Sequence, residues 1–119
     1  MRAALALAFF AASPAVGQSL RSVAPPSSLA EVKLHRLSGE ANAVRLLIEV
    51  SNRSGRFSPF IDASCTAFDA TGAPLGVETG LTRNLGPGES DRRIILIRPV
   101  APAKASAAAS ASCRIVSVD

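Results

Sequence analysis

Alternation of apolar and polar side chains marks the clearest element of the chain, at residues 43–52. Its even-numbered positions from Val44 to Val50 carry branched apolar side chains, and Arg45 and Glu49 stand between them. A period of two places successive side chains on opposite faces of a strand. We therefore predict a β-strand here, with one face in the core and the other mostly in contact with solvent.

Five further segments have strand patterns. They cover residues 32–37, 60–68, 74–85, 89–98 and 111–118. The run from Ile94 to Ile97 is too apolar and too rich in branched side chains for a surface loop, so it predicts a central strand. Pro59 cannot donate to a ladder, and we place the start of the third strand after it. Gly76 and Gly80 interrupt their segment, which is typical of a bulged or edge strand.

Short stretches with turn chemistry separate the strands. They lie at residues 38–39, 52–55, 69–72 and 86–88. Asn and Gly adopt positive φ at low cost, and Asp69 and Gly72 suit the first and fourth positions of a type I turn. Asn52, Arg53 and Ser54 also fit the N-glycosylation acceptor pattern, but the turn interpretation requires no particular host and we prefer it.

One segment near the C-terminus has an ambiguous pattern. Residues 103–112 are mainly alanine and serine. The alanines favour a helix, whereas the serines and the neighbouring strand patterns do not, and we predict a loop that leads into the last strand. The whole pattern predicts an all-β, antiparallel β-sandwich of six to seven strands over residues 29–119.

The first 17 residues have the pattern of a secretory signal peptide. Arg2 precedes an apolar run at residues 3–12, and Pro14 and small residues follow it. The run is about half of the roughly 20 residues that span a bilayer. We expect cleavage between Gly17 and Gln18, a location in the periplasm, and no membrane anchor in the mature chain.

The mature chain has the length of a single domain, because 119 − 17 = 102 residues remain. Residues 18–28 are rich in Pro and Ser and predict a flexible lead-in. The formal net charge of the full chain is +4, with basic and acidic residues intermixed, and the chain has no Tyr or Trp. Nucleic-acid binding would require a basic stripe with interleaved aromatic residues, so we exclude that class.

The chain has two cysteines, Cys65 and Cys113. A pair of cysteines in an exported chain predicts a structural disulfide, and alternation places both on predicted core faces. Closing a loop of about 49 residues contributes on the order of 4 kcal/mol in the chain-entropy model. A redox pair would require close Cys-x-x-Cys spacing, and a metal site would find only His35 as a further soft ligand. We predict no metal and no cofactor.

Catalytic groups are sparse in this sequence. His35 is the only histidine, and no G-x-S-x-G elbow occurs. We predict that the protein is not an enzyme, and a small hydrolase with His35 as its base is the alternative. Arg56, Phe57 and Phe60 lie on one short segment and form the candidate contact surface. For Phe60, the alternative is that its ring fills the end of the core.

The order of several short motifs resembles the FxLYD-type β-sandwich modules of exported and envelope-associated bacterial proteins. These motifs are IEVSN at residues 48–52, FD at 68–69, Gly72, and LGPGES at 85–90. Phe68 and Asp69 match the tyrosine and aspartate positions of the FxLYD motif, whereas Cys65 and Ala67 occupy its phenylalanine and leucine positions. The resemblance covers residues 30–118. It implies an immunoglobulin-like or fibronectin-III-like sandwich without a cofactor or a known active site.

The sequence therefore predicts an exported, non-catalytic β-sandwich module that acts in binding or assembly in the bacterial periplasm. Its expected partner is another envelope protein. The alternative is a periplasmic inhibitor or chaperone-like protein that presents an edge strand, for which residues 74–85 are the candidate.

Overall fold

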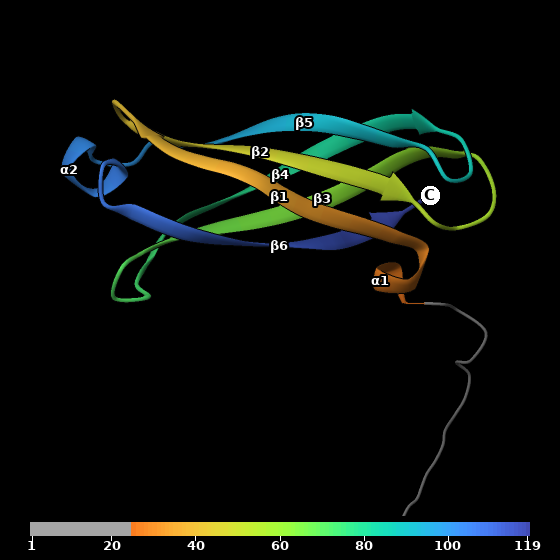
Figure 1. The fold of residues 1–119 in the computed structure, drawn as a ribbon, viewed down its shortest axis with the longest axis horizontal. Helices are drawn as coiled ribbons and strands as arrows, with labels where there is room; N and C mark the ends of the chain where they lie inside the picture. Colours follow the sequence, from red (N-terminus) through yellow and green to blue (C-terminus); the bar gives the residue numbers. More distant parts are fainter. Residues whose placement is uncertain (1–24) are drawn as a thin grey trace, which may run out of the picture.

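The computed structural model describes residues 25–119, which form an antiparallel β-sandwich (Figure 1). The elements are α1 (Pro26–Leu29), β1 (Ala30–Glu40), β2 (Ala43–Asn52), β3 (Ser58–Asp69), β4 (Pro74–Leu85), β5 (Ser90–Ile97), α2 (Pro102–Ala105) and β6 (Ala108–Val118). The prediction of an all-β sandwich of six to seven strands is confirmed, with six strands. The predicted signal peptide at residues 1–17 lies outside the described residues. Between residues 25 and 119, no helix is long and apolar enough to span a membrane.

Each layer of the sandwich has three strands. The first sheet has the order β1-β2-β5 and the second sheet has the order β4-β3-β6, and every pair of neighbours is antiparallel. These orders correspond to strands A-B-E and C′-C-F of an immunoglobulin sandwich. The central strands are therefore β2 and β3, and the other four strands lie at sheet edges. The prediction of a central strand at residues 94–97 is wrong, because β5 pairs with β2 alone among the described strands.

The core lies between the inner faces of β2 and β3. The completely buried side chains of these faces are Val44, Leu46, Ile48 and Val50 on β2, and Ile61, Ala63, Cys65 and Ala67 on β3. Both sets occupy alternate positions, as the period of two predicts. Each central strand thus contributes a row of four buried apolar side chains to the core, because its neighbours on both sides exclude solvent.

Close approach between β4 and β5 closes one side of the core. A Cβ atom at Gly80 would lie 2.8 Å from Cδ1 of Ile95, and one at Gly76 would lie 2.7 Å from Cγ2 of Ile97. The two glycines predicted an edge strand, and β4 is one. Their packing role is to leave room for the isoleucines of the facing sheet.

Strand β1 is longer than predicted, and the predicted turn at residues 38–39 is wrong. The ladder continues through Gly39, which pairs with Val44, and through Glu40, which pairs with Ala43. The chain reverses at Ala41, whose φ is +40°. Gly39 is instead a site of close approach, because an added Cβ would lie 1.9 Å from the carbonyl oxygen of Ala105 in α2.

We expect Gly39→Ala to lower the free energy of unfolding by about 3 kcal/mol, because its methyl group must displace backbone atoms. Gly80→Ala is the matched control, since its methyl group meets only the end of the flexible Ile95 side chain. Chemical denaturation of both variants measures the difference. Equal losses in the two variants would contradict the close packing of β1 against α2.

Several other element boundaries also differ from the prediction. Strand β3 begins at Ser58 and so includes Pro59. The residues on either side, Ser58 and Phe60, pair with β4, whereas Pro59 has no partner there. Residues 26–28, predicted as lead-in, belong to α1. The predicted loop before the last strand contains α2, and β6 begins at Ala108 rather than at residue 111.

Candidate functional site

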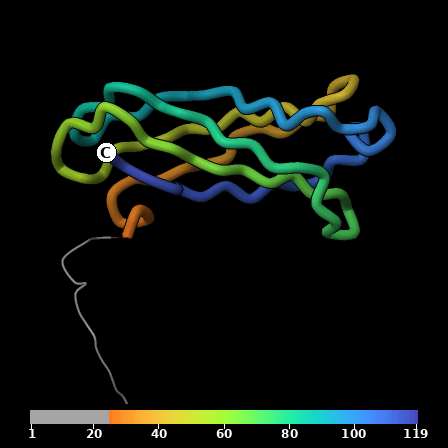
Figure 2. Tube along the Cα trace, turned by 180° about the vertical axis from the view of Figure 1, so that it is seen from behind, coloured from red at the N-terminus to blue at the C-terminus, as the bar shows by residue number. Residues whose placement is uncertain are grey.

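Two loops meet at one end of the sandwich, beside the C-terminus (Figures 1 and 2). We name this region the loop end; it comprises residues 53–57 between β2 and β3 and residues 86–89 between β4 and β5. A hollow of about 440 Å³ lies there. Its lining residues are Ser51, Asn52, Arg53, Gly55, Gly88 and Ser90. The opposite end carries α2 and the β1–β2 and β3–β4 hairpins.

The side chain of Asn52 joins the two loops. Its Nδ2 donates to the carbonyl oxygens of Arg56 at 2.8 Å, Leu85 at 2.8 Å and Gly86 at 3.2 Å. Its Oδ1 accepts from the Ser54 backbone amide at 2.9 Å and from the Ser54 hydroxyl at 2.7 Å. Every polar atom of this buried amide has a hydrogen-bond partner, so the two loops are held in a fixed position relative to each other.

The backbone of Asn52 reinforces the same junction. Its amide donates to the carbonyl oxygen of Glu89 at 2.9 Å, and its own carbonyl accepts from the Gly88 amide at 2.9 Å. The side chain is completely buried. The turn interpretation of residues 52–55 is therefore confirmed, and the folded chain does not offer the Asn52 amide for glycosylation.

The predicted contact residues lie at or beside the loop end. Phe57 is 55% exposed, and Phe60, on β3, is 38% exposed, so neither ring is enclosed in the core. The Arg83 guanidinium of β4 lies 5.2 Å from the centroid of the Phe60 ring, within the range of a cation–π contact. The carbonyl of Arg56 accepts from Asn52, which fixes the backbone next to Phe57.

Charged residues of both signs lie near these two aromatic rings, because Arg83 lies over Phe60 and the Asp119 amide donates to the carbonyl oxygen of Phe60 at 2.9 Å. Arg53 pairs with Glu31 of β1. Arg56 and Arg83 make no ion pair with any residue between 25 and 119. The contact surface therefore combines two exposed aromatic rings with charged groups of both signs.

The sequence did not indicate that Arg83 belongs to this surface. Arg83 reaches Phe60 because the two residues are direct partners in the β3–β4 ladder. The turn at residues 69–72 could have indicated this pairing, because counting residues outward from a hairpin turn along both strands predicts which residues face each other. An irregularity between Ala67 and Phe68 shifts that count.

His35 lies on the outer face of the first sheet, in a pair with Glu49. Its Nε2 is 2.6 Å from Oε1 of Glu49. The hydrogen bond with His35 holds the pKa of the Glu49 carboxyl below its ordinary value, and the positive charges of His35, Arg92 and Lys33 act in the same direction. In the described part of the chain, no hydroxyl or thiol side chain bonds to the ring.

Asp69 holds the turn at the opposite end of the molecule. Its Oδ1 accepts from the Thr71 amide at 2.9 Å, the Thr71 hydroxyl at 2.6 Å and the Ala73 amide at 3.0 Å. The hydrogen bonds from Thr71 and Ala73 lower the pKa of this carboxyl. The predicted turn at residues 69–72 is confirmed, and Asp69 acts in it as a hydrogen-bond acceptor.

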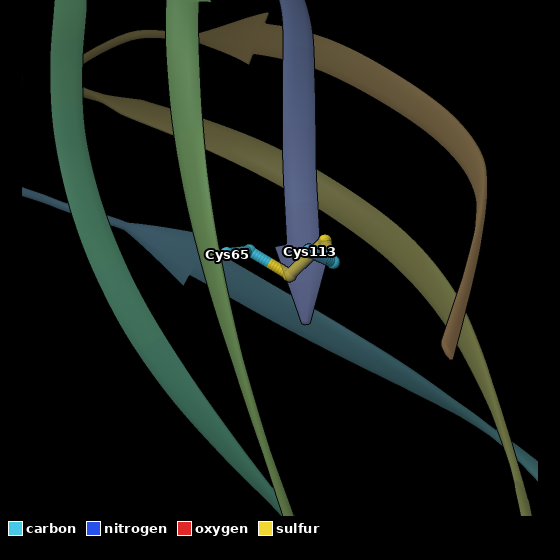
Figure 3. Close-up of a disulfide and its surroundings, with 2 residues drawn as sticks. All are labelled: Cys65 and Cys113. Atoms are coloured by element: carbon cyan, nitrogen blue, oxygen red, sulfur yellow. A yellow bond between two sulfur atoms is a disulfide. The ribbon is translucent and has the colours of Figure 1, made fainter. Parts of the chain in front are cut away.

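Cys65 and Cys113 form a disulfide between neighbouring strands of the second sheet (Figure 3). The residues pair directly in the β3–β6 ladder, with their Cα atoms 4.1 Å apart. Cys65 is completely buried and Cys113 is half-buried. The predicted disulfide is confirmed, and it ties the last strand to the middle of its sheet. Residues 25–119 bring together no three His, Cys, Asp or Glu side chains that could hold a metal ion.

Comparison with known proteins gives a likeness of fold. No family model matches the chain, and no curated protein sequence matches it. A crystal structure of a DUF1425 family member from Shewanella sp. pv-4 matches with a TM-score of 0.52 and 16% identity, over 74% of this chain and 77% of that chain. This similarity supports the fold, a β-rich domain of this kind. It does not support the FxLYD resemblance in particular, which stays a prediction.

Proposed function

We propose that this protein is an exported, non-catalytic module that binds an envelope protein in the bacterial periplasm through its loop end. The exposure of Phe57 on a loop whose backbone is fixed by Asn52 carries the proposal. The signal-peptide pattern and the disulfide support export, because disulfides form and persist in oxidising compartments.

Aromatic and arginine side chains are the residues that most often dominate the energy of protein interfaces. Phe57 and Phe60 provide the rings, and Arg56 and Arg83 provide the guanidinium groups beside them. A loop that is already ordered loses little conformational entropy on binding. The hydrogen bonds of Asn52 thus favour binding without contacting the partner.

A non-catalytic role also agrees with the surroundings of His35. A base in nucleophilic catalysis needs a nucleophile within hydrogen-bond reach. The observed partner of the ring is the carboxylate of Glu49, on the outer face of the first sheet. We interpret this contact as a surface ion pair.

We expect Phe57→Ser to weaken capture of the envelope partner about tenfold or more, because the variant removes the largest exposed ring of the surface. Its free energy of unfolding should change by no more than about 0.5 kcal/mol. Quantitative pull-down from an envelope fraction, with purified wild type and variant at matched concentrations, measures the capture.

Val77→Ser is the matched control, because Val77 is 60% exposed but lies on β4, outside the loop end. This variant should capture the partner as well as wild type does. Equal capture by Phe57→Ser and Val77→Ser would contradict the proposal. A loss of several kcal/mol in Phe57→Ser would instead show that the ring packs in the core.

A further inference from the structure

A second surface runs along the outer edge of β6. In the described residues, β3 is the only strand that pairs with β6, so the outer edge of β6 has no hydrogen-bonded partner strand, although β1 and α1 pack near it. In the immunoglobulin order, strand G occupies this place beside strand F. Unpaired backbone groups at a sheet edge form a template for a further strand.

The disulfide indicates which backbone groups of β6 face this edge. The Cα atoms of Cys65 and Cys113 are 4.1 Å apart, a separation typical of a non-hydrogen-bonded pair in an antiparallel ladder. The N–H and C=O of Cys113 therefore point away from β3. Ala111 and Ile115 lie two residues before and after Cys113 and pair with Ala67 and Ala63 of β3, so their N–H and C=O groups also point away from β3. These three residues present a row of donors and acceptors along the edge.

The core is incompletely covered on the same side of the sandwich. Leu34 of β1 pairs with the completely buried Ile48 and so belongs to the inner face, yet it is 36% exposed. Ala111 on the inner face of β6 is only half-buried. On the opposite side, Ile95 is 3% and Ile97 is 2% exposed. The asymmetry shows that apolar surface remains available beside the β6 edge.

Strand β6 carries fewer charged residues than the other edge strands do, and the two irregularities of its ladder lie outside residues 111–115. Strand β1 carries Lys33 and Arg36 with a register irregularity between residues 34 and 36, and β5 carries Arg92 and Arg93. Strand β6 contains no proline, and Arg114 is its single charged residue. Helix α1 lies beside only the C-terminal end of β6 (Figures 1 and 2). Charges, bulges and proline are the usual protection of an edge.

We propose that β6 accepts an extended segment of a partner polypeptide by β-augmentation. The segment pairs with the backbone groups of Ala111, Cys113 and Ile115, and its alternate apolar side chains cover Leu34. The exposed Arg114 favours an acidic residue in the segment, because no residue between 25 and 119 pairs with it. A second copy of β6 fits less well, because its own Arg114 would add a second positive charge at the same edge. This surface is separate from the loop end, so each proposal can fail without the other.

The probe is a fluorescein-labelled peptide of about nine residues, with valines alternating with threonines and one glutamate, a pattern of high β-propensity. We expect saturable binding by fluorescence anisotropy. Hydrogen exchange by NMR should show the amides of Ala111, Cys113 and Ile115 exchanging fast in the free protein and slowly in the complex. No measurable binding, or binding without protection of these amides, overturns the proposal.

Three variants locate the site. Ala111→Pro removes a donor that faces the open edge and leaves the β3–β6 ladder intact, so affinity for the peptide should fall about tenfold or more. Arg114→Glu tests the same edge without a backbone change and should also weaken binding of this peptide. Thr79→Pro blocks the edge of β4 in the same way. The backbone groups of Cys65 point towards Glu78 of β4, so those of the next residue, Thr79, point to the open edge of β4. It should leave affinity unchanged.

The outcomes separate the possible occupants. Loss of binding in Thr79→Pro but not in Ala111→Pro would assign the accepting edge to β4 and overturn the proposal. Amides of β6 that are already protected in the free protein, to a degree that rises with protein concentration, would show pairing with a second copy and also overturn it. Phe57→Ser should bind the peptide as wild type does, which distinguishes this edge from the loop end.

Discussion

Replacing Cys65 or Cys113 with alanine is expected to lower the free energy of unfolding by about 4 kcal/mol. The two residues are 48 positions apart, and the bond between them restricts the unfolded chain far more than a short loop would. Typical domains are stable by about 5 to 15 kcal/mol, so the loss removes a large part of the total. Chemical denaturation of the unreduced variants measures it.

The double variant Cys65→Ala, Cys113→Ala should be no less stable than the weaker single variant. Each single replacement already removes the bond, so the second has little left to remove. A reducing agent should destabilise the wild type by a similar amount and leave the variants unchanged. Losses that add in the double variant would contradict the pairing of these two cysteines.

Asn52→Ala should produce the second-largest loss, about 3 kcal/mol or more. The variant leaves the carbonyl groups of Arg56, Leu85 and Gly86 without their donor, and each buried unsatisfied group costs about 1–3 kcal/mol. The two loops of the loop end should also lose their fixed relation. Faster amide exchange in residues 53–57 measures this second effect.

Ser54→Ala is the matched control for Asn52→Ala. It removes the hydroxyl that donates to Oδ1 of Asn52, while the Ser54 backbone amide still donates to the same atom. We expect a loss of about 1 kcal/mol or less. If Asn52→Ala lowers the free energy of unfolding by no more than this value, water replaces the Asn52 amide as the hydrogen-bond donor between the two loops, which would contradict the prediction.

The sequence predicted those parts of the fold that depend on local pattern. Strand β2 was predicted with its observed bounds, and its inner face and the core-facing position of Cys65 on β3 were predicted correctly, because a central strand buries one face and leaves a period of two. The disulfide was predictable because only one pairing of two cysteines exists.

Other features depend on contacts between distant segments. Gly39 was predicted in a turn because glycine favours turns, whereas the structure requires glycine for the approach of Ala105. The start of β6 at Ala108 was not predicted, because alanine and serine have no strong strand propensity and pairing with β3 decides the boundary. Tertiary contacts override local propensity at both places.

The candidate site was predictable only in part for the same reason. Arg56, Phe57 and Phe60 are close in sequence, so composition alone brought them together. Arg83 contributes through the register of the β3–β4 hairpin, which composition does not show. Asn52 was predicted as a turn residue, but its partners at Leu85 and Gly86 lie 33 and 34 positions away.

Site-specific photo-cross-linking in the producing cells tests most directly that the loop end contacts a partner. A benzophenone amino acid replaces Phe57 in one variant and Val77 in another, since both side chains are exposed. The account predicts one discrete protein adduct from position 57 and none from position 77. An absence of adducts at position 57, or the same adducts from both positions, would contradict it.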